Sequence, residues 1–387
     1  MSAETLALRA GYPAGAAPRA AAGRGHGFSI PSLEGIRAVA VMIVFIAHCG
    51  LQHLVPGGFG VTIFFFLSGY LITTLLRREY EQTGTISLRA FYLRRVYRIF
   101  PPLYLVLGIL IALDATGVIG NGDLPLKAVL AQVFHFTNYY MVTFSPAESA
   151  PLVTYTGPFW SLAVEEHFYL FFPLCLLLLL RRKAPLPVVL GIACAVVLAW
   201  RCFLVLTMSG ADDYTYHATD TRIDSLLFGC IMGLWLNPAL DPAPSRVGER
   251  GWLALCAAGV ALLAVSFLYR ADFFRDTFRY SVQGVALFPL FWCAVRYHRW
   301  PVFSWLDSRP VRGLGIISYT FYLSHYAAIH LTEKAFGLGQ VAGGVAGFVA
   351  AVAFSTACYW LIERRFAALR RRLHREPSAA PRTAAAQ

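Results

Sequence analysis

The chain has 387 residues, of which 57% are hydrophobic and only 14% are charged, and its mean hydropathy is +0.57. This composition is too apolar for an ordinary soluble protein and indicates a membrane protein. The net charge of +12 does not by itself indicate a nucleic-acid partner, because in a membrane protein the location of positive residues matters more than their sum. The eight cysteines lie in apolar runs without a CxxC pair or metal-ligand spacing, which predicts core residues and no metal site.

Three regions are predicted along the chain. Residues 1–30 lack the apolar core of a cleavable signal and are expected to be a disordered cytoplasmic arm. Residues 31–366 are expected to form a membrane-embedded domain, and residues 367–387 a basic, largely disordered cytoplasmic tail. Because a spanning helix needs roughly 20 apolar residues, the apolar runs predict an all-α polytopic bundle of about ten transmembrane helices, near residues 34–52, 59–76, 100–118, 160–180, 185–207, 223–236, 252–269, 280–297, 314–331 and 341–361.

The first apolar segment carries Arg37 near its start and His48 near its end. An ionisable side chain in hydrocarbon costs about 2.5–3.5 kcal/mol on insertion scales, so both residues call for an explanation. Their separation corresponds to roughly 1100° of helix rotation and about 16 Å of rise, which places both side chains on one face. The alternative is two separate roles, with Arg37 reaching the headgroups and His48 bonded to a backbone carbonyl. The shared face favours one polar cavity along the helix.

The segment between the second and third predicted helices is rich in arginine and is expected to be a cytoplasmic loop that ends at Pro101. Arg95 and Arg98 are three residues apart, so their side chains can converge on one anion. A phosphate-rich ligand is the specific interpretation. Ordinary positive charge that binds acidic lipid headgroups is the alternative.

The fourth, sixth and ninth predicted segments carry polar residues toward the ends that are expected to face outward. Glu165 and Glu166 open the fourth segment, and at least one is expected to face the bundle interior, because two adjacent carboxylates are costly against lipid. In the sixth segment, Asp224 either contributes to a polar site or forms a structural ion pair with Arg222. His325 lies in the outer half of the ninth segment.

The distribution of basic residues predicts the topology. With the N-terminus in the cytoplasm, 25 of the 33 Lys and Arg residues fall in inside segments and six in outside segments. This asymmetry predicts that both termini are cytoplasmic. A full span within residues 120–159 would reverse the downstream half, so that region is expected to be half-inserted or interfacial.

Seven motifs in order resemble the acyltransferase 3 family of integral-membrane bacterial enzymes, which O-acylate surface and secreted glycans. The resemblance covers residues 32–366 and is carried by SLEGIRAVAVMIVFIAH, GGFGVTIFFFLSGYLIT, RRVYRIFPPLY, FWSLAVEEHFYLFFPL, TRIDSLLFGCIMG, ISYTFYLSHYAAI and ERRF. It implies transfer of an acyl group, by default acetyl, from cytoplasmic acyl-CoA to a glycan hydroxyl at the outer face of the bacterial inner membrane. It also implies that His48, Arg37, Arg95 and Arg98 are the functional residues.

The sequence departs from the family pattern in three places. Thr62 stands where members often carry Asp, and His167 stands where Gln is common. Some members also carry an extracytoplasmic esterase-like domain, which is not found in this sequence, so the chain is expected to act alone or with a separate partner.

The chemistry of the residues suggests a role for each. Arg37, Arg95 and Arg98 would hold the donor, and His48 would act as a base or would carry the acyl group. Glu165 or Glu166 would orient the imidazole, as in serine-hydrolase triads. Tyr169, Asp224 and His325 are predicted to bind acceptor hydroxyls. These three have structural alternatives, such as an interface anchor for Tyr169.

No permanently bound cofactor is expected, since acyl-CoA is a substrate. The expected partners are acyl-CoA, a glycan or glycolipid acceptor, membrane lipids and glycan-synthesis machinery. A proton-coupled transporter or flippase is the main alternative, because buried charges also mark such proteins. The sequence shows no paired repeats to support it. A purely structural scaffold would leave the intramembrane charges without a purpose.

Overall fold

The computed structural model describes residues 28–119, 125–144, 151–243 and 247–372. Contacts divide the chain into residues 1–30 and residues 31–387. Of the first unit only residues 28–30 are described, and they have no regular secondary structure. The predicted arm therefore lies almost wholly outside the described residues. The second unit is helical throughout its described ranges and has no strand there, which confirms the all-α prediction.

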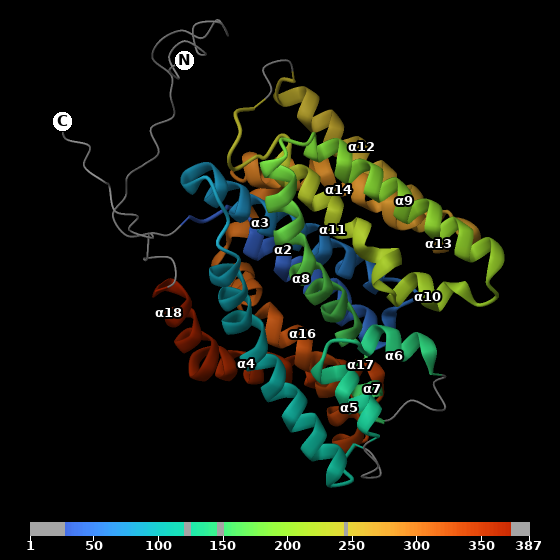
Figure 1. Ribbon diagram of the computed structural model, residues 1–387. Coiled ribbons are helices and arrows are strands. Elements are labelled where there is room, and N and C mark those ends of the chain that lie inside the picture. Colours follow the sequence, from blue (N-terminus) through green and yellow to red (C-terminus); the bar gives the residue numbers. More distant parts are fainter. Residues whose placement is uncertain (1–27, 120–124, 145–150, 244–246, 373–387) are drawn as a thin grey trace, which may run out of the picture. The chain divides into compact units, whose positions relative to one another are not determined.

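Each of the ten predicted segments overlaps one long helix (Figure 1). Their bounds are α2 Leu33–Ile46, α3 Gly57–Thr83, α4 Leu88–Ala115, α8 Phe159–Arg181, α9 Leu186–Thr207, α11 Thr219–Leu234, α12 Glu249–Leu268, α14 Phe278–Arg296, α16 Arg309–Phe336 and α17 Gln340–Cys358. The π-helical turn η1, Ala47–Leu51, extends α2, and η3, Tyr359–Glu363, extends α17.

Eight candidate spans in the described residues are long and apolar enough to cross a membrane, so the protein is a multi-pass membrane protein. The two helices outside this set are α11, with only 16 residues, and α16, with 28. Other helices cover most of α11 and the middle of α16. A helix that faces protein rather than lipid does not need an apolar surface, which explains the polar residues on the buried side of α16.

The centre of the bundle depends on close approach between α3 and α11. A Cβ atom on Gly229 would overlap the carbonyl oxygen of Phe66, and one on Gly69 would overlap that of Leu226. The two backbones are therefore in direct contact, which is the small-residue packing expected between membrane helices. Around this pair, α2 packs on α3 and α16, while α14 packs on α11 and α12.

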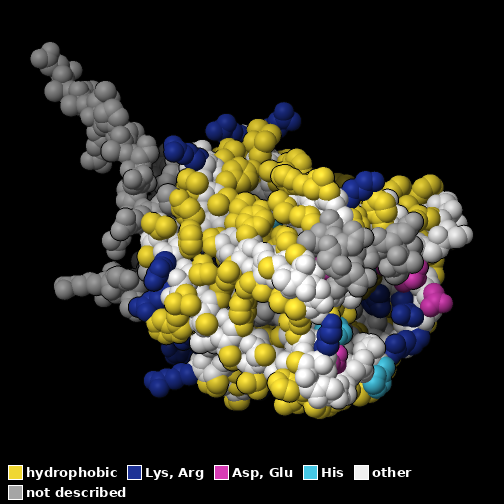
Figure 2. All heavy atoms as spheres, turned by 90° about the horizontal axis from the view of Figure 1, so that it is seen from below, with side chains coloured by type: hydrophobic (Ala, Val, Ile, Leu, Met, Phe, Trp, Pro, Cys, Tyr) yellow, Lys and Arg dark blue, Asp and Glu magenta, His cyan; other side chains and the backbone are white. Residues whose placement is uncertain are grey.

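The outer helices expose apolar side chains. In α9, α12 and α17 only 22% of the membrane-length window is buried. Side chains such as Leu206, Leu268 and Val345 are more than half exposed. Hydrophobic atoms accordingly cover much of the face shown in Figure 2. A surface of this kind is suited to lipid.

The start of α4 differs from the prediction. The helix begins at Leu88, with the Ser87 side chain accepting a hydrogen bond from the Ala90 amide, and continues through Pro101 and Pro102. The expected loop is therefore mostly helix. Proline is a poor guide here, because it removes only its own hydrogen bond and the surrounding bundle holds the helix together.

The short helices lie outside the spanning set: α5 Leu126–Val133, α6 Thr137–Thr143, α7 Pro151–Tyr155, α10 Ala211–His217, α13 Asp272–Asp276, α15 Pro301–Ser304 and the 3-10 turn η2 Trp305–Asp307. The described part of residues 120–159 contains no full-length span, as predicted. Figure 1 places α6, α7, α10 and α13 on the side of the bundle away from α18, Arg364–Arg372. These are called the α13 side and the α18 side. Helix α18 also runs past the domain boundary predicted at residue 366.

Candidate active site

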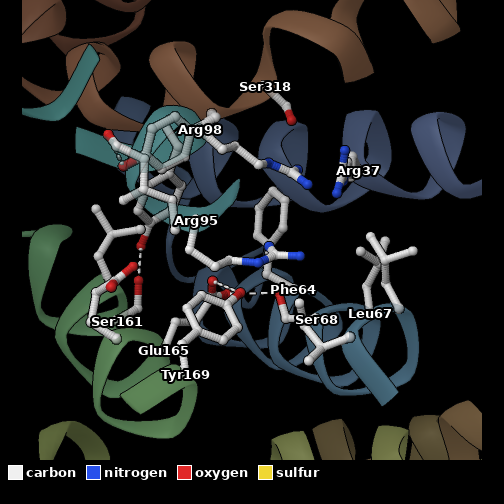
Figure 3. Close-up of a pocket in the computed structure, with 17 residues that line it drawn as sticks. Arg37, Phe64, Leu67, Ser68, Arg95, Arg98, Ser161, Glu165, Tyr169 and Ser318 are labelled. Carbon is white, nitrogen blue, oxygen red and sulfur yellow. Dashed lines mark hydrogen bonds between the residues drawn. The ribbon is translucent and has the colours of Figure 1, made fainter. Parts of the chain in front are cut away.

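A cavity lies among α2, α3, α4, α8 and α16, with about 720 Å³ of space not occupied by protein atoms. We call it the central cavity. Arg37 of α2 and Arg95 and Arg98 of α4 line it. Figure 3 shows their three guanidinium groups turned toward the same space. The α-helical start of α4 explains this arrangement, because residues three apart lie on one face.

Two of these arginines have no carboxylate partner in the part of the chain that the structure describes. Arg37 pairs with Glu34 at 3.2 Å. The recorded contacts of the Arg95 guanidinium are the rings of Phe91 and Tyr169, with its carbon 5.5 and 5.2 Å from their centroids. Among the described residues no ion pair is formed by Arg95 or Arg98. The cavity therefore presents donors suited to phosphate or carboxylate oxygens.

Carboxylates share this cavity. Glu165 and Glu166 both line it, and Glu165 accepts hydrogen bonds from Ser68 at 3.1 Å and from Tyr169 at 2.8 Å. The sequence placed the arginines in a cytoplasmic loop and the glutamates near the outer face. The structure instead brings both groups together, because α4 carries its arginines into the bundle.

His48 is paired with another histidine. Its Nδ1 atom lies 2.8 Å from Nε2 of His325, and Nδ1 of His325 lies 2.8 Å from the carbonyl oxygen of Tyr322. A carbonyl only accepts, so His325 carries its proton on Nδ1. For uncharged rings, Nε2 of His325 then accepts from Nδ1 of His48. This leaves Nε2 of His48 with a free lone pair, and no described residue bonds that atom.

The contacts of this pair differ from two of the expectations. The partner that orients His48 is His325, whereas the recorded partners of Glu165 are Ser68 and Tyr169. His325 is completely buried, so it offers no surface to an acceptor. Its contacts make it a positioning residue for His48. The sequence signal for this pairing was weak, because the two histidines are 277 residues apart.

His48 does not line the central cavity, although Arg37 does. The projection along one helix fails near His48. Helix α2 ends at Ile46, and His48 lies in the π-helical turn Ala47–Leu51, whose residues do not keep the 100° spacing of an α-helix. Tyr322 links the two places, since it lines the cavity and its carbonyl holds His325.

Asp224 is completely buried and bonded to Arg201, at 2.9 Å to Nη1 and 2.7 Å to Nη2. Ser281 donates a third bond, at 3.0 Å. The ion pair considered for Asp224 therefore forms with Arg201 and not with Arg222. With its oxygens already bonded, Asp224 is better placed to hold α9 and α11 together than to bind sugar.

The two positions that depart from the expected motif both face polar groups. Thr62 accepts a hydrogen bond from Nη2 of Arg222 at 3.2 Å, so Arg222 meets a hydroxyl where a carboxylate was expected. His167 Nδ1 lies 2.7 Å from the hydroxyl of Thr219.

Residues that the sequence did not single out also shape the site. The Ser161 and Tyr322 hydroxyls lie 2.7 Å apart, and Ser68 holds Glu165. Ser161 and Ser68 lie inside the motifs quoted above, but nothing in a single sequence distinguishes them from packing residues.

Comparison with known proteins decides the family. The family model of the acyltransferase 3 domain, described as an acyltransferase domain, matches residues 30–364. The chain belongs to the acyltransferase 3 family. The residues of this acyltransferase domain include the central cavity and the histidine pair.

Curated proteins that resemble this chain are named as O-acetyltransferases. The chain is 30% identical over 323 residues to O-acetyltransferase OatA of Staphylococcus aureus strain NCTC 8325, covering 81% of this chain and 52% of the relative. It is likewise 30% identical over 331 residues to a putative O-acetyltransferase of Staphylococcus aureus strain COL, with the same coverage. The chain thus spans about half the length of these relatives. No solved structure matches it.

Proposed function

We propose that this acyltransferase 3 protein is a bacterial inner-membrane O-acetyltransferase that moves an acetyl group from acetyl-CoA to a hydroxyl of a cell-surface or exported glycan. The observation that carries the proposal is the convergence of three guanidinium groups on the central cavity, two of them without a carboxylate partner among the described residues. The names of the O-acetyltransferase relatives support the type of transfer.

The donor would approach from the α18 side. That side corresponds to the cytoplasm in the topology favoured by the basic residues, and acyl-CoA is cytoplasmic. The guanidinium groups of Arg95 and Arg98 would bind its phosphates, and Arg37 would guide the pantetheine arm. Glu165 and Tyr169 are bonded to each other in the same cavity and would restrict where the donor lies.

The chemistry is assigned to Nε2 of His48. In one route Nε2 takes the proton of the acceptor hydroxyl while the hydroxyl oxygen attacks the thioester carbon. The C–S bond then breaks, and the CoA thiolate leaves with the proton that Nε2 had taken. In the other route Nε2 attacks the thioester carbon, the C–S bond breaks, and CoA leaves as a thiolate. The acceptor oxygen then attacks the acetyl carbon, the bond between Nε2 and that carbon breaks, and the hydroxyl proton passes to the departed CoA thiolate or to solvent. In both routes His325 holds Nδ1 of His48, as an orienting group does in hydrolase triads.

The acceptor would be a glycan or glycolipid that reaches the α13 side, with glycan-synthesis machinery as a partner. The competing interpretation, a proton-coupled transporter or flippase, needs no acyl-CoA and is distinguished by the same experiment.

The test uses the full chain in lipid vesicles with radiolabelled acetyl-CoA, following CoA release and label on added surface glycans. We expect His48→Asn to abolish both, because the amide can still reach His325 but Nε2 is lost. Arg95→Ala/Arg98→Ala is expected to weaken binding of acetyl-CoA at least tenfold. The matched control is Arg89→Ala, an exposed arginine of the same helix that does not line the cavity.

Full transfer by His48→Asn would refute the assigned chemistry. Failure of the wild-type protein to bind acetyl-CoA would refute the proposed donor and favour a transporter. The two routes are distinguished by mixing the protein with radiolabelled acetyl-CoA in the absence of an acceptor and then quenching the reaction. Label that stays on the wild-type protein but not on His48→Asn indicates an acetyl-histidine.

A further inference from the structure

A second cavity opens on the α13 side, with about 810 Å³ of space not occupied by protein atoms. We call it the α13 cavity. It is lined by the link between η1 and α3, by the start of α3, by α10, by the end of α12, by Arg275 of α13 and by the start of α14. Gln52, its first lining residue, directly follows the π turn that carries His48. The cavity is thus close along the chain to the proposed reacting group.

Three arginines line the α13 cavity, and no Asp or Glu does. Arg270 is exposed and has no ion pair among the described residues. Among the described residues Arg275 forms one ion pair, with Asp272 at 3.4 Å, and the two side chains are 42% and 89% exposed. Arg279 donates to the Tyr280 hydroxyl at 3.1 Å. An exposed pair of that length contributes little, so it leaves the Arg275 guanidinium largely available to a ligand. Asp276, which does not line the cavity, interacts electrostatically with Arg275 and Arg279 and offsets part of their charge.

The floor of the cavity adds buried positive charge. The guanidinium carbon of Arg222 lies 3.9 Å from the centroid of the Tyr280 ring and 5.5 Å from that of Tyr216, and both tyrosines line the cavity. Arg222 is completely buried, and in the described residues its hydrogen-bond partners are the Tyr216 carbonyl and the Thr62 hydroxyl. A buried cation bonded only to neutral groups raises the electrostatic potential above it.

This clustering is unusual for its side of the membrane. Only six Lys and Arg residues fall in segments assigned to the outside, and four of them line this cavity or lie beneath it. Figure 2 shows basic side chains around a hollow at the right-hand edge, with acidic side chains beside them; α13 lies at this edge in Figure 1. Basic residues are generally depleted on the outer face, so their concentration in one cavity calls for a ligand.

The remaining lining favours a saccharide. Tyr216, Tyr269 and Tyr280 offer ring faces and hydroxyls, and Gln52 and Gln283 offer amides. Aromatic rings with a few well-placed polar groups are typical of pockets for small polar ligands. A lipid headgroup would use the arginines but not a lining of this kind.

We infer that the α13 cavity binds the acyl acceptor, and that this acceptor is an acidic saccharide whose carboxylate or phosphate is held by Arg275 and Arg279. The inference rests on the proposed function for identifying the ligand as the acceptor. The presence of an anion-binding site rests on the cavity alone.

The test measures binding without acyl-CoA, so that its failure is distinct from failure of the transferase. The full chain is placed in phosphatidylcholine nanodiscs. Equilibrium dialysis then measures the affinity for each of two acidic probes and for its neutral counterpart. The pairs are trigalacturonic acid with its methyl ester, and glucose 6-phosphate with glucose. We expect at least one anionic probe to bind at least tenfold more tightly than its neutral partner. Arg275→Gln/Arg279→Gln should remove that advantage, and Lys127→Gln, which changes another cation outside the cavity, should not.

Thr62→Asp gives an independent check. It places a carboxylate against Arg222 and should weaken binding of the anionic probe several-fold without altering any lining residue. Equal binding of acidic and neutral probes, no binding of either anionic probe, or an anionic advantage that survives Arg275→Gln/Arg279→Gln would overturn the inference. A separate measurement compares how much phosphatidylglycerol and phosphatidylcholine the purified protein retains. If Arg275→Gln/Arg279→Gln changes only this lipid preference and not binding of the saccharide probes, the cavity binds lipid headgroups and the inference is also overturned.

Discussion

The buried pair between Arg201 and Asp224 provides the sharpest test of the fold. Both side chains are fully buried, and Asp224 accepts two bonds from Arg201 and one from Ser281. A hydrogen bond to a charged group contributes about 1.5–3 kcal/mol. Asp224→Ala removes two such bonds within the pair and leaves a buried guanidinium without its counter-charge. We therefore expect the free energy of unfolding to fall by about 3–5 kcal/mol.

The double variant Arg201→Met/Asp224→Leu should recover most of that loss, because it removes both charges and fills the space with apolar atoms. The control is Asp213→Asn, since Asp213 is 59% exposed and pairs with His217 at the surface. Such a pair contributes about 1 kcal/mol or less. The assay is equilibrium unfolding in mixed micelles titrated with sodium dodecyl sulfate.

The result that refutes this reasoning is specific. A loss below about 1 kcal/mol in Asp224→Ala, together with a raised KM for the glycan, would mean that Asp224 binds substrate and does not secure the fold. A double variant as unstable as the single one would mean that the charge of Arg201 is not the cause.

Three further predictions concern packing, positioning and pH. Gly229→Ala should destabilise the protein by about 1–3 kcal/mol in the same unfolding assay, because its Cβ overlaps the α3 backbone, whereas Gly191→Ala, with open space around it, should not. His325→Asn should lower kcat for acetyl transfer at least tenfold with little change in the KM for acetyl-CoA, because it frees the ring of His48; an unchanged kcat would contradict the positioning role. Burial, aided by a neighbouring histidine, lowers the pKa of His135 from 6.5 to about 4, so the folded state resists protonation and stability should fall as the pH drops from 6.5 toward 4. Unfolding measured across that pH range should show a shallower decline in His135→Gln, and an identical decline would show that other groups are responsible.

The helical content and the positions of the long helices follow from the sequence, because hydropathy is a local property and one apolar run is sufficient to specify a spanning helix. The same reasoning fails at the start of α4. The charged residues from Leu88 to Arg98 lack the apolar signal of a span, yet they continue the helix into the bundle. Local composition indicates which segments can be buried in lipid. It does not indicate where a helix begins when contacts with neighbouring helices stabilise a charged segment.

By itself the sequence determined a helical membrane protein and the motifs that include Arg37, His48, Arg95 and Glu165. Only the tertiary structure decided the partners of these residues. It placed Arg95 beside Tyr169 and paired His48 with His325, which lies 277 residues further along the chain. A helix repeat fixes which residues share a face, but the neighbour of that face depends on how distant helices cross. Those crossings are set by close backbone contacts such as the one at Gly229, which no local pattern reveals.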